Sequence, residues 1–355
     1  GDALVTDVVV PDDVNEIGEH AFARCTSIKT VDTGRQVTII AAHAFDGCTA
    51  LTDVNIGISV MTIGDAAFAG CAVTEYAIPA SVTSIGDGVF HLNERLAEFT
   101  VDKNNIQYIA YNGDLYDKFS GLLVRYAVAK PDTVFRSPSF MKSVASGAFR
   151  HAKNLVSITL GGSVASIGDC AFGNCAALND VTILCTSVNI NGDVFWTSHP
   201  ETLSVPAGAV GIVPYGVKNL TVNGGETLAA KAFAFNETLE RVTISDGVKT
   251  IGDEAFRNCP RLTSVTLADS VTTIGASAFH YAVALTALTV PGKVTAIGAG
   301  AFLGTALTEL NFADPAGWFG GETAVDEATL SDPASAAELL KSSNAAFTKS
   351  PAAGE

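Results

Sequence analysis

The sequence predicts a β-rich α/β solenoid, a right-handed superhelix with one long parallel β-sheet and short turns or single helical turns on the opposite side. Two observations carry this prediction. A motif of the form Ile-Gly-x-x-Ala-Phe recurs with a period of 23 residues, and a short segment of alternating apolar and polar residues follows most copies. One such unit cannot bury its own apolar side, so the units are expected to stack on one another.

Eleven phenylalanines define the repeat. The steps between them are 23, 23, 22, 59, 23, 23, 38, 23, 23 and 23 residues, so the period is interrupted twice. They are Phe22, Phe45, Phe68, Phe90, Phe149, Phe172, Phe195, Phe233, Phe256, Phe279 and Phe302. The regular steps predict that these rings occupy the same place in successive coils.

The positions around each phenylalanine keep the same register. The residue five positions earlier is aliphatic in all eleven copies, the residue four positions earlier is Gly in seven, and the preceding residue is Ala in nine. These small residues indicate that the backbone turns within a crowded cross-section. The residue three positions later is Cys in five copies, namely Cys25, Cys48, Cys71, Cys175 and Cys259.

The segments that follow the turns have the pattern of half-buried strands. Leu51–Ile56 and Leu262–Leu267 alternate apolar and polar residues over their second halves, and β-branched residues are common in them. Stacking the units in register would place Ile, Phe, Leu and Val in continuous buried columns.

Composition excludes several classes of protein. The chain has 355 residues, of which 48% are apolar, and 37 acidic against 21 basic side chains give a net charge of −16. The apolar content argues against disorder, and the acidic excess argues against a nucleic-acid partner. No run approaches the roughly 20 apolar residues of a membrane span, so we expect no membrane insertion by this chain.

The repeat units resemble those of the BspA-like leucine-rich-repeat surface proteins. Ser81–Phe90 (SVTSIGDGVF) and Gly247–Phe279 (GVKTIGDEAFRNCPRLTSVTLADSVTTIGASAF) carry the resemblance, which extends over about residues 4–312. The resemblance implies a leucine-rich-repeat fold and a secreted or surface-attached protein, as found in gut and oral bacteria and some parasitic protists. It implies adhesion or recognition as the function, and it supplies no catalytic residues.

The first interruption of the repeat, at about residues 102–140, contains four of the seven tyrosines of the chain. Asn112-Gly113-Asp114 between apolar runs predicts a β-hairpin, and the segment resembles the hairpin insertion of BspA-like proteins. One interpretation is a hairpin that pads the solenoid, and the other is a protruding aromatic ligand site. The candidate ligand-binding residues are Tyr108, Tyr111, Tyr116 and Tyr126.

The second interruption, at about residues 185–231, holds Trp196 and Tyr215 and is expected to form an irregular coil and a connection. We therefore divide the chain into a solenoid of residues 1–312 and a C-terminal cap and linker of residues 313–355. Within the cap, Asp332 and Pro333 predict the start of a helix over 334–341, and the end from Lys349 is expected to be a frayed terminus or linker.

The cysteines and histidines suggest no cofactor or metal. No Cys-x-x-Cys pair occurs, and a 23-residue spacing fits no zinc motif, so the cysteine column is interpreted as a ladder of buried thiols. His20 and His43 share a column, and Glu19 is the obvious third metal ligand; the alternative is that both histidines are exposed turn residues.

No nucleophile elbow, phosphate loop or hydrolase carboxylate pair is present, so we expect no enzymatic activity.

The outward positions of the predicted strands are mostly Thr and Ser and carry no aromatic residue, which argues against a sugar-stacking platform on this sheet. Asp53, Glu75 and Glu98 are expected to stack in three consecutive coils. At about 5 Å in water each neighbouring pair would cost roughly 0.8 kcal/mol. The column is either a solvated acidic face or a patch for a basic partner or Ca²⁺, although no calcium-loop motif supports the latter.

Together these features predict non-catalytic recognition or adhesion at a bacterial surface, with a host or bacterial protein or a glycan as the ligand. The alternative is a structural spacer that displays another domain. An extracellular location rests on the resemblance, with a signal peptide presumed to have been removed before Gly1. The sequence does not indicate the oligomeric state.

Overall fold

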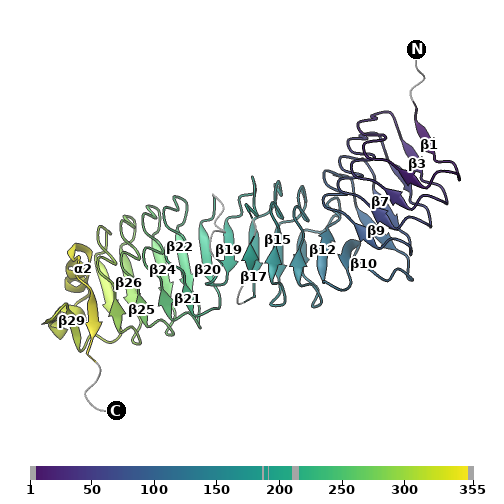
Figure 1. Cartoon of the computed structure of the whole chain (residues 1–355). Helices are drawn as coiled ribbons and strands as arrows, with labels where there is room; N and C mark the ends of the chain where they lie inside the picture. Colours follow the sequence, from purple (N-terminus) through teal and green to yellow (C-terminus); the bar gives the residue numbers. More distant parts are fainter. Residues whose placement is uncertain (1–4, 186–187, 191, 210–215, 351–355) are drawn as a thin grey trace. The chain divides into compact units, whose positions relative to one another are not determined.

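A computed structural model describes residues 5–185, 188–190, 192–209 and 216–350. The predicted solenoid fold is confirmed, since successive coils lie in parallel with little helix (Figure 1). The chain divides into two compact units, which are described separately. The first comprises Gly1–Ser157, Ser163–Leu178 and Ile190–Ser198, and the second comprises Ile158–Gly162, Asn179–Asn189 and His199–Glu355.

In the first unit each coil contributes strands to two rows. The row of longer strands forms the parallel groups β1-β3-β5 and β7-β9, and the row of two-residue strands forms the parallel sheet β2-β4-β6-β8. The longer strands are β1 (Asp7–Val9), β3 (Thr30–Asp32), β5 (Asp53–Asn55), β7 (Glu75–Ile78), β9 (Glu98–Val101) and β13 (Val134–Arg136). The short strands are β2 (Glu16–Ile17), β4 (Ile39–Ile40), β6 (Thr62–Ile63), β8 (Ser84–Ile85), β14 (Ser143–Val144) and β16 (Ser166–Ile167).

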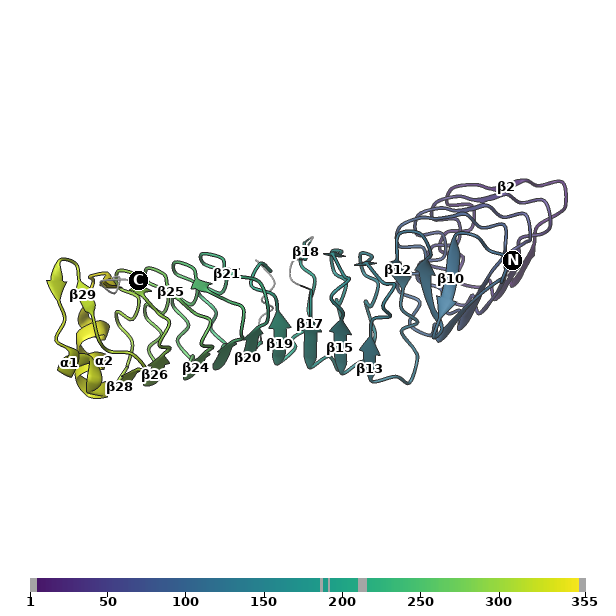
Figure 2. The same ribbon diagram turned by 90° about the horizontal axis from the view of Figure 1, so that it is seen from below.

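The second unit repeats this arrangement, and Figure 2 shows its two rows on opposite sides of the coils. The longer strands are β15 (Ser157–Leu160), β17 (Asp180–Ile183), β19 (Thr202–Val205), β20 (Asn219–Val222), β22 (Arg241–Ile244), β24 (Ser264–Leu267), β26 (Ala287–Val290) and β28 (Glu309–Phe312). The short strands are β21 (Thr227–Leu228), β23 (Thr250–Ile251), β25 (Thr273–Ile274) and β27 (Ala296–Ile297). Strand β18 (Asn189–Ile190) has one residue in each unit and belongs to the sheet of β14 and β16. The second row was not predicted as strand, because two residues are too few to show an alternation.

The phenylalanine column forms the centre of the core. Phe45, Phe68, Phe256 and Phe279 are fully buried. The rings of Phe45 and Phe68 lie 5.3 Å apart and nearly parallel, and those of Phe256 and Phe279 are 5.4 Å apart. This distance is close to the spacing of neighbouring strands, so the stacking follows directly from the pairing of the coils.

Two residues in the left-handed region bend the chain around each phenylalanine. The residue two positions after the Phe has a positive φ in all eleven copies, as in Asn258 (φ 53°) and Tyr281 (φ 57°). The residue two positions before it is also left-handed in most copies, as in Glu254 (φ 56°). Such a conformation costs a non-glycine residue roughly 1–2 kcal/mol, so stacking of the coils must stabilise these bends.

The glycine column has a different cause, which is close approach of the backbone. A Cβ on Gly64 would lie 2.5 Å from the backbone nitrogen of Ala42 in the preceding coil, and one on Gly298 would lie 2.2 Å from that of Ala276. Gly18, in the first copy of the motif, has no atom within 4 Å of the corresponding point. The glycines are therefore needed where a coil stacks on a preceding one.

The second interruption supplies an additional short coil. Strands β19 and β20 are direct parallel neighbours although Thr202 and its partner Asn219 are only 17 residues apart. The expectation of an irregular coil is thus met by β19 and β20. Trp196 follows the Phe195 turn and is 41% exposed, whereas Tyr215 lies outside the described residues.

The C-terminal segment covers the last coil. The predicted helix is confirmed as α2 (Pro333–Ser342), whose N-cap Asp332 accepts a hydrogen bond of 2.8 Å from the backbone nitrogen of Ser335. It follows α1 (Glu327–Ser331), and both pack against β28 (Figure 2). Lys349, expected in a frayed terminus, instead belongs to β31 (Phe347–Lys349), which pairs antiparallel with β27 and with β29 (Trp318–Gly320). Strand β30 (Thr323–Ala324) completes this small sheet.

Candidate ligand-binding site

The first interruption forms the predicted hairpin. Strands β10 (Tyr108–Tyr111) and β11 (Asp114–Asp117) are antiparallel, and Asn112 (φ 51°) and Gly113 (φ 78°) form the turn between them. Two consecutive left-handed residues match the right-handed twist of the strands, which is why Asn-Gly favours this turn. Strand β11 then pairs with β12 (Leu122–Arg125), which lies parallel to β14 and so joins the hairpin to the row of short strands.

Only one of the four candidate tyrosines is exposed. The exposed fractions are 5% for Tyr108, 1% for Tyr116 and 1% for Tyr126, against 43% for Tyr111. Three of the rings therefore pad the core of the first unit. The interpretation of the insertion as a ligand site then depends on Tyr111.

Tyr108 completes the edge of the short-strand sheet. Strand β8 is the last strand of the sheet β2-β4-β6-β8, and the Tyr108 hydroxyl accepts a hydrogen bond of 2.9 Å from the backbone nitrogen of Ile85 in that strand. A side chain of the insertion thus replaces a neighbouring strand as the partner of this amide.

Tyr111 forms an aromatic cluster with Tyr116 and Phe140. The Tyr111 and Phe140 rings meet edge to face with their centroids 5.5 Å apart, and Phe140 contacts the buried Tyr116 at 5.3 Å. Phe140 is itself 39% exposed. Tyr111 and Phe140 therefore form an exposed pair of aromatic rings held in place by a buried one.

A buried ion pair lies next to this cluster. The Nζ atom of Lys130 is 2.9 Å from Oδ2 of Asp114, and Oδ1 of Asp114 accepts a hydrogen bond of 2.9 Å from the backbone nitrogen of Ala127. Burial raises the pKa of Asp114 to about 6, although Lys130 and the Ala127 amide act in the opposite direction. With Tyr111 and Tyr126 these groups line a cavity of about 60 Å³, which is too small for more than a water or two.

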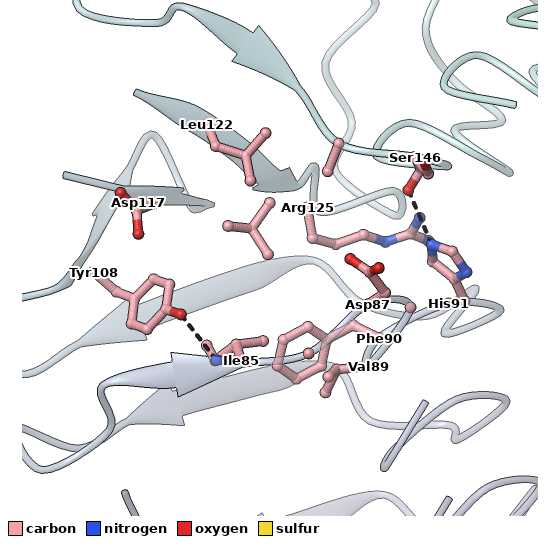
Figure 3. Close-up of a pocket in the computed structure, with 14 residues that line it drawn as sticks. Ile85, Asp87, Val89, Phe90, His91, Tyr108, Asp117, Leu122, Arg125 and Ser146 are labelled. Atoms are coloured by element: carbon pink, nitrogen blue, oxygen red, sulfur yellow. Dashed lines mark hydrogen bonds between the residues drawn. The ribbon is translucent and has the colours of Figure 1, made fainter. Parts of the chain in front are cut away.

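A larger pocket of about 230 Å³ lies between the end of β8 and β12 (Figure 3). Its apolar lining includes Phe90 and Leu122. Its polar lining includes the side chains of Asp87, His91, Tyr108, Asp117 and Arg125. Asp117 is already bonded within the insertion, since its carboxylate accepts hydrogen bonds from the backbone of Phe119 and Ser120 and from the Gln107 amide.

Arg125 is buried in the wall of this pocket, with 2% of its surface exposed. Its Nη1 donates a hydrogen bond of 2.6 Å to the Gly147 carbonyl, and its Nη2 donates one of 3.1 Å to the Arg150 carbonyl. Its Nε has no hydrogen-bond partner within the part of the chain that the structure describes. Burial lowers the pKa of the guanidinium to about 10, so it remains charged at neutral pH.

His91 lies beside this charge. Its Nε2 is 3.2 Å from the Ser146 carbonyl, to which it donates when the ring is neutral (Figure 3). Burial and the positive charge of Arg125 both lower the pKa of His91. The ring is therefore neutral at physiological pH and adds no second charge to the pocket.

The acidic column is interrupted between Asp53 and Glu75. Glu75 and Glu98 are direct neighbours in β7 and β9, whereas Asp53 is paired with Thr30 in the separate group β1-β3-β5. All three carboxylates are exposed, and Thr100 donates a hydrogen bond of 3.3 Å to Glu75. No group of three or more His, Cys, Asp or Glu side chains with metal-binding geometry occurs among the described residues.

The cysteine column is a ladder of free thiols, as expected. Cys48, Cys71, Cys175 and Cys259 are buried, and Cys25 is partly buried. Burial raises the pKa of Cys48 to about 11 and those of Cys175 and Cys259 to about 12. His20 and His43 stack with their ring centroids 4.8 Å apart, and His20 contacts Glu19 at 3.4 Å.

Sequence reasoning missed two sets of residues. Arg125 and His91 carried no motif. Phe235 and Tyr281, which are 60% and 51% exposed, lie at the turn position two residues after the repeat phenylalanine. The same position holds Leu92, which is 45% exposed, and polar or small residues in the other copies. Large apolar residues at a turn position were a signal that the sequence did contain.

The repeats identify the family. The model of the BspA type leucine-rich repeat region, with six copies, matches residues 15–112, 133–223 and 216–322. The chain belongs to the BspA-type leucine-rich repeat family. The match covers the stacked coils of both units, whereas most of the insertion, including β11 and β12, falls in the gap between matched segments. The pocket draws on both parts. Phe90, His91 and Ser146 lie in matched segments, whereas Asp117, Leu122 and Arg125 lie in the gap.

Solved structures of other leucine-rich repeat proteins are similar to this BspA-type chain. A leucine-rich cell surface protein from Faecalibacterium prausnitzii is 28% identical, with 74% of this chain and 79% of that chain covered and a TM-score of 0.47. A protein from Eubacterium ventriosum is 27% identical, with 86% and 84% covered and a TM-score of 0.49. One from Bacteroides ovatus is 24% identical, with 87% and 73% covered and a TM-score of 0.47.

The search of curated proteins gave no match. Among the described residues, no helix has the length and apolar character needed to cross a membrane.

Proposed function

We propose that this BspA-type chain is a non-catalytic recognition module at a bacterial cell surface, and that it binds a protein or glycan of the host or of another bacterium through the insertion. The observation that supports the proposal is the exposed pair of Tyr111, at the end of strand β10 of the hairpin, and Phe140, at the end of the insertion, whose rings meet at 5.5 Å. The extracellular location is supported by the family and by the description of the relative from Faecalibacterium prausnitzii as a cell surface protein.

Aromatic rings in this position suit recognition for a physical reason. Tyr and Phe bring a large contact area with few rotatable bonds, and aromatic residues are enriched among those that dominate binding energy. Tyr116 is buried beneath both rings and contacts each of them. Little conformational entropy would then be lost when a ligand covers the pair.

The test is a binding screen of the purified chain against extracellular matrix proteins and a glycan array at physiological salt. The screen is run in parallel with the double variant Tyr111→Ser and Phe140→Ser. A specific ligand is expected to lose at least about tenfold in affinity, as at an interface hot spot. Phe235→Ser and Tyr281→Ser together remove two rings of similar exposure from the second unit and serve as the control.

A ligand that binds both double variants equally well would contradict the assignment to the insertion. The triple variant Asp53→Asn, Glu75→Gln and Glu98→Gln then tests the acidic strand face. Lost binding in that variant, strongest at low salt, would indicate a basic partner.

A structural spacer is the second candidate. Burial of Tyr108, Tyr116 and Tyr126 favours it, because three of the four rings that suggested a ligand site serve the core. A spacer would give no specific hit in the screen. Deleting one 23-residue coil would instead reduce the reach of a domain fused to the chain, measured as accessibility of that domain to an antibody on whole cells.

A further inference from the structure

Arg125 forms no ion pair with a carboxylate among the described residues, although Asp87 and Asp117 line the same pocket. The side chain is 2% exposed, and its described hydrogen bonds go to the backbone carbonyls of Gly147, Ala148 and Arg150. The neighbouring groups that act on its pKa are Cys175 and Arg150, neither of which carries a negative charge at neutral pH. A buried cation without a counter-charge is costly, because carbonyl dipoles replace only part of its hydration.

The guanidinium also keeps an unused donor in the wall of a pocket. Among the described residues its Nε has no partner and almost no exposed surface, and the side chain runs along the wall of the 230 Å³ pocket toward His91 and Ser146 (Figure 3). The other wall is formed by Ile85, Phe90 and Leu122, which are apolar. An apolar wall that faces a few polar and charged groups is typical of sites for small molecules.

We propose that this pocket binds a small monocarboxylate of about the size of one sugar acid, whose carboxylate pairs with Arg125. A carboxylate matches the planar fork of a guanidinium and would supply the counter-charge that the fold lacks. The pocket is far larger than a simple inorganic ion needs, so the remainder of the ligand lies against Phe90 and Leu122. The site is separate from the Tyr111 and Phe140 pair and does not depend on the proposed function.

The charges that line the pocket favour a ligand with one negative charge over a ligand with two. Asp87 and Asp117 line the same space as Arg125. Their carboxylates would repel a sulfate or a dianionic phosphate more strongly than a monocarboxylate. Neutral His91 offers no second cation to offset that repulsion, because burial and Arg125 lower its pKa.

The test measures binding to the full chain by ligand-observed NMR and calorimetry, with four probes. These are glucuronate, acetate, glucose and sulfate, each at constant ionic strength. The proposal expects glucuronate to bind more tightly than acetate, with glucose and sulfate weaker than both. Equal binding of glucose and glucuronate would overturn it, as would an absence of glucuronate binding up to the solubility limit.

Two variants with opposite expected effects locate the site. Arg125→Gln removes the charge and is expected to weaken glucuronate binding by roughly tenfold or more, as for loss of a charge-assisted hydrogen bond. Asp87→Asn lies at the exposed rim and is expected to strengthen it by about threefold, because a like charge is removed. If Arg125→Gln does not fold, Asp87→Asn alone decides, and unchanged or weaker binding in that variant contradicts the proposal.

Discussion

The hydroxyl of Ser198 donates a hydrogen bond of 2.6 Å to the backbone carbonyl of Phe172, 26 residues earlier. Cys48, Cys71, Cys175 and Cys259 occupy the same repeat position, and their thiols lie 3.1 to 3.4 Å from the equivalent carbonyls. Asn93 makes the corresponding bond to Phe68 at 2.7 Å. The column therefore suits a compact donor, and cysteine fills it as a small residue with a weak S–H donor, although Ala152 and Ala282 occupy the same position without one.

Replacing Ser198 tests how much the hydrogen bond contributes to stability. Ser198→Ala would leave the Phe172 carbonyl without this donor and the backbone nitrogen of Cys175 without its acceptor at 2.8 Å. We expect a loss of about 1–3 kcal/mol in the free energy of unfolding, measured by urea denaturation. Ser198→Cys is the matched control and should keep most of the stability. A loss as large in Ser198→Cys as in Ser198→Ala would show that shape rather than donation matters.

The thiol ladder predicts a pattern of chemical reactivity. Thiolate is the reactive form, and burial raises the pKa of Cys48 to about 11 and of Cys175 and Cys259 to about 12. We expect that only the partly exposed Cys25 and Cys170 react with a thiol reagent at pH 8, whereas all seven react in denaturant. Fast modification of Cys71 or Cys259 in the native protein would mean that the coils open readily.

The bond between Tyr108 and Ile85 predicts a local effect. Tyr108→Phe removes the acceptor of the Ile85 amide but keeps the ring that lines the pocket. We expect a cost of about 1 kcal/mol and faster hydrogen exchange at Ile85, measured by NMR. Tyr111→Phe changes an exposed hydroxyl and should leave that exchange rate as it is. Equal rates in wild type and Tyr108→Phe would indicate that water serves this amide.

Asp114 predicts a pH dependence of stability. Burial raises its pKa from 3.8 to about 6, so the folded chain binds this proton more tightly than the unfolded chain does. The free energy of unfolding should therefore fall as pH rises between these values, by up to about 3 kcal/mol in total. Asp114→Asn lacks this titration, so the difference between the two pH profiles isolates it. A difference that grows in favour of the wild type as pH rises would show that pairing with Lys130 outweighs burial.

The repeat was predictable because equivalent positions of successive units are buried in the same way. The position of Phe256, the thiol of Cys259 and the start of α2 at Asp332 and Pro333 each follow from a local pattern that the structure preserves. The orientation of the tyrosines was also present in the sequence. Tyr108 and Tyr111 are three positions apart on one strand and so face opposite sides.

Arg125 could not be placed in the same way. It ends the run Leu122–Arg125, where a charged residue after apolar ones suggests an outward position. Its partners are backbone carbonyls of Gly147 and Arg150, which no side-chain pattern reports. The pocket likewise depends on how β12 lies relative to β8, and the spacing of residues does not encode that distance.

The antiparallel pairing of β31 with β27 has a consequence for how the number of repeats can change. Each coil offers the next one an edge in the parallel direction, whereas Phe347 and Thr348 occupy the edge beyond Ala296 and Ile297 in the opposite direction. A duplicated coil inserted after Ile297 would have to displace that strand. A coil inserted between those of Phe256 and Phe279 could form parallel strand pairs and stacked rings with the neighbouring coil on each side. On this side of the second unit, growth or loss by whole repeats is thus confined to the coils before β27, and β31 fixes where such changes must stop.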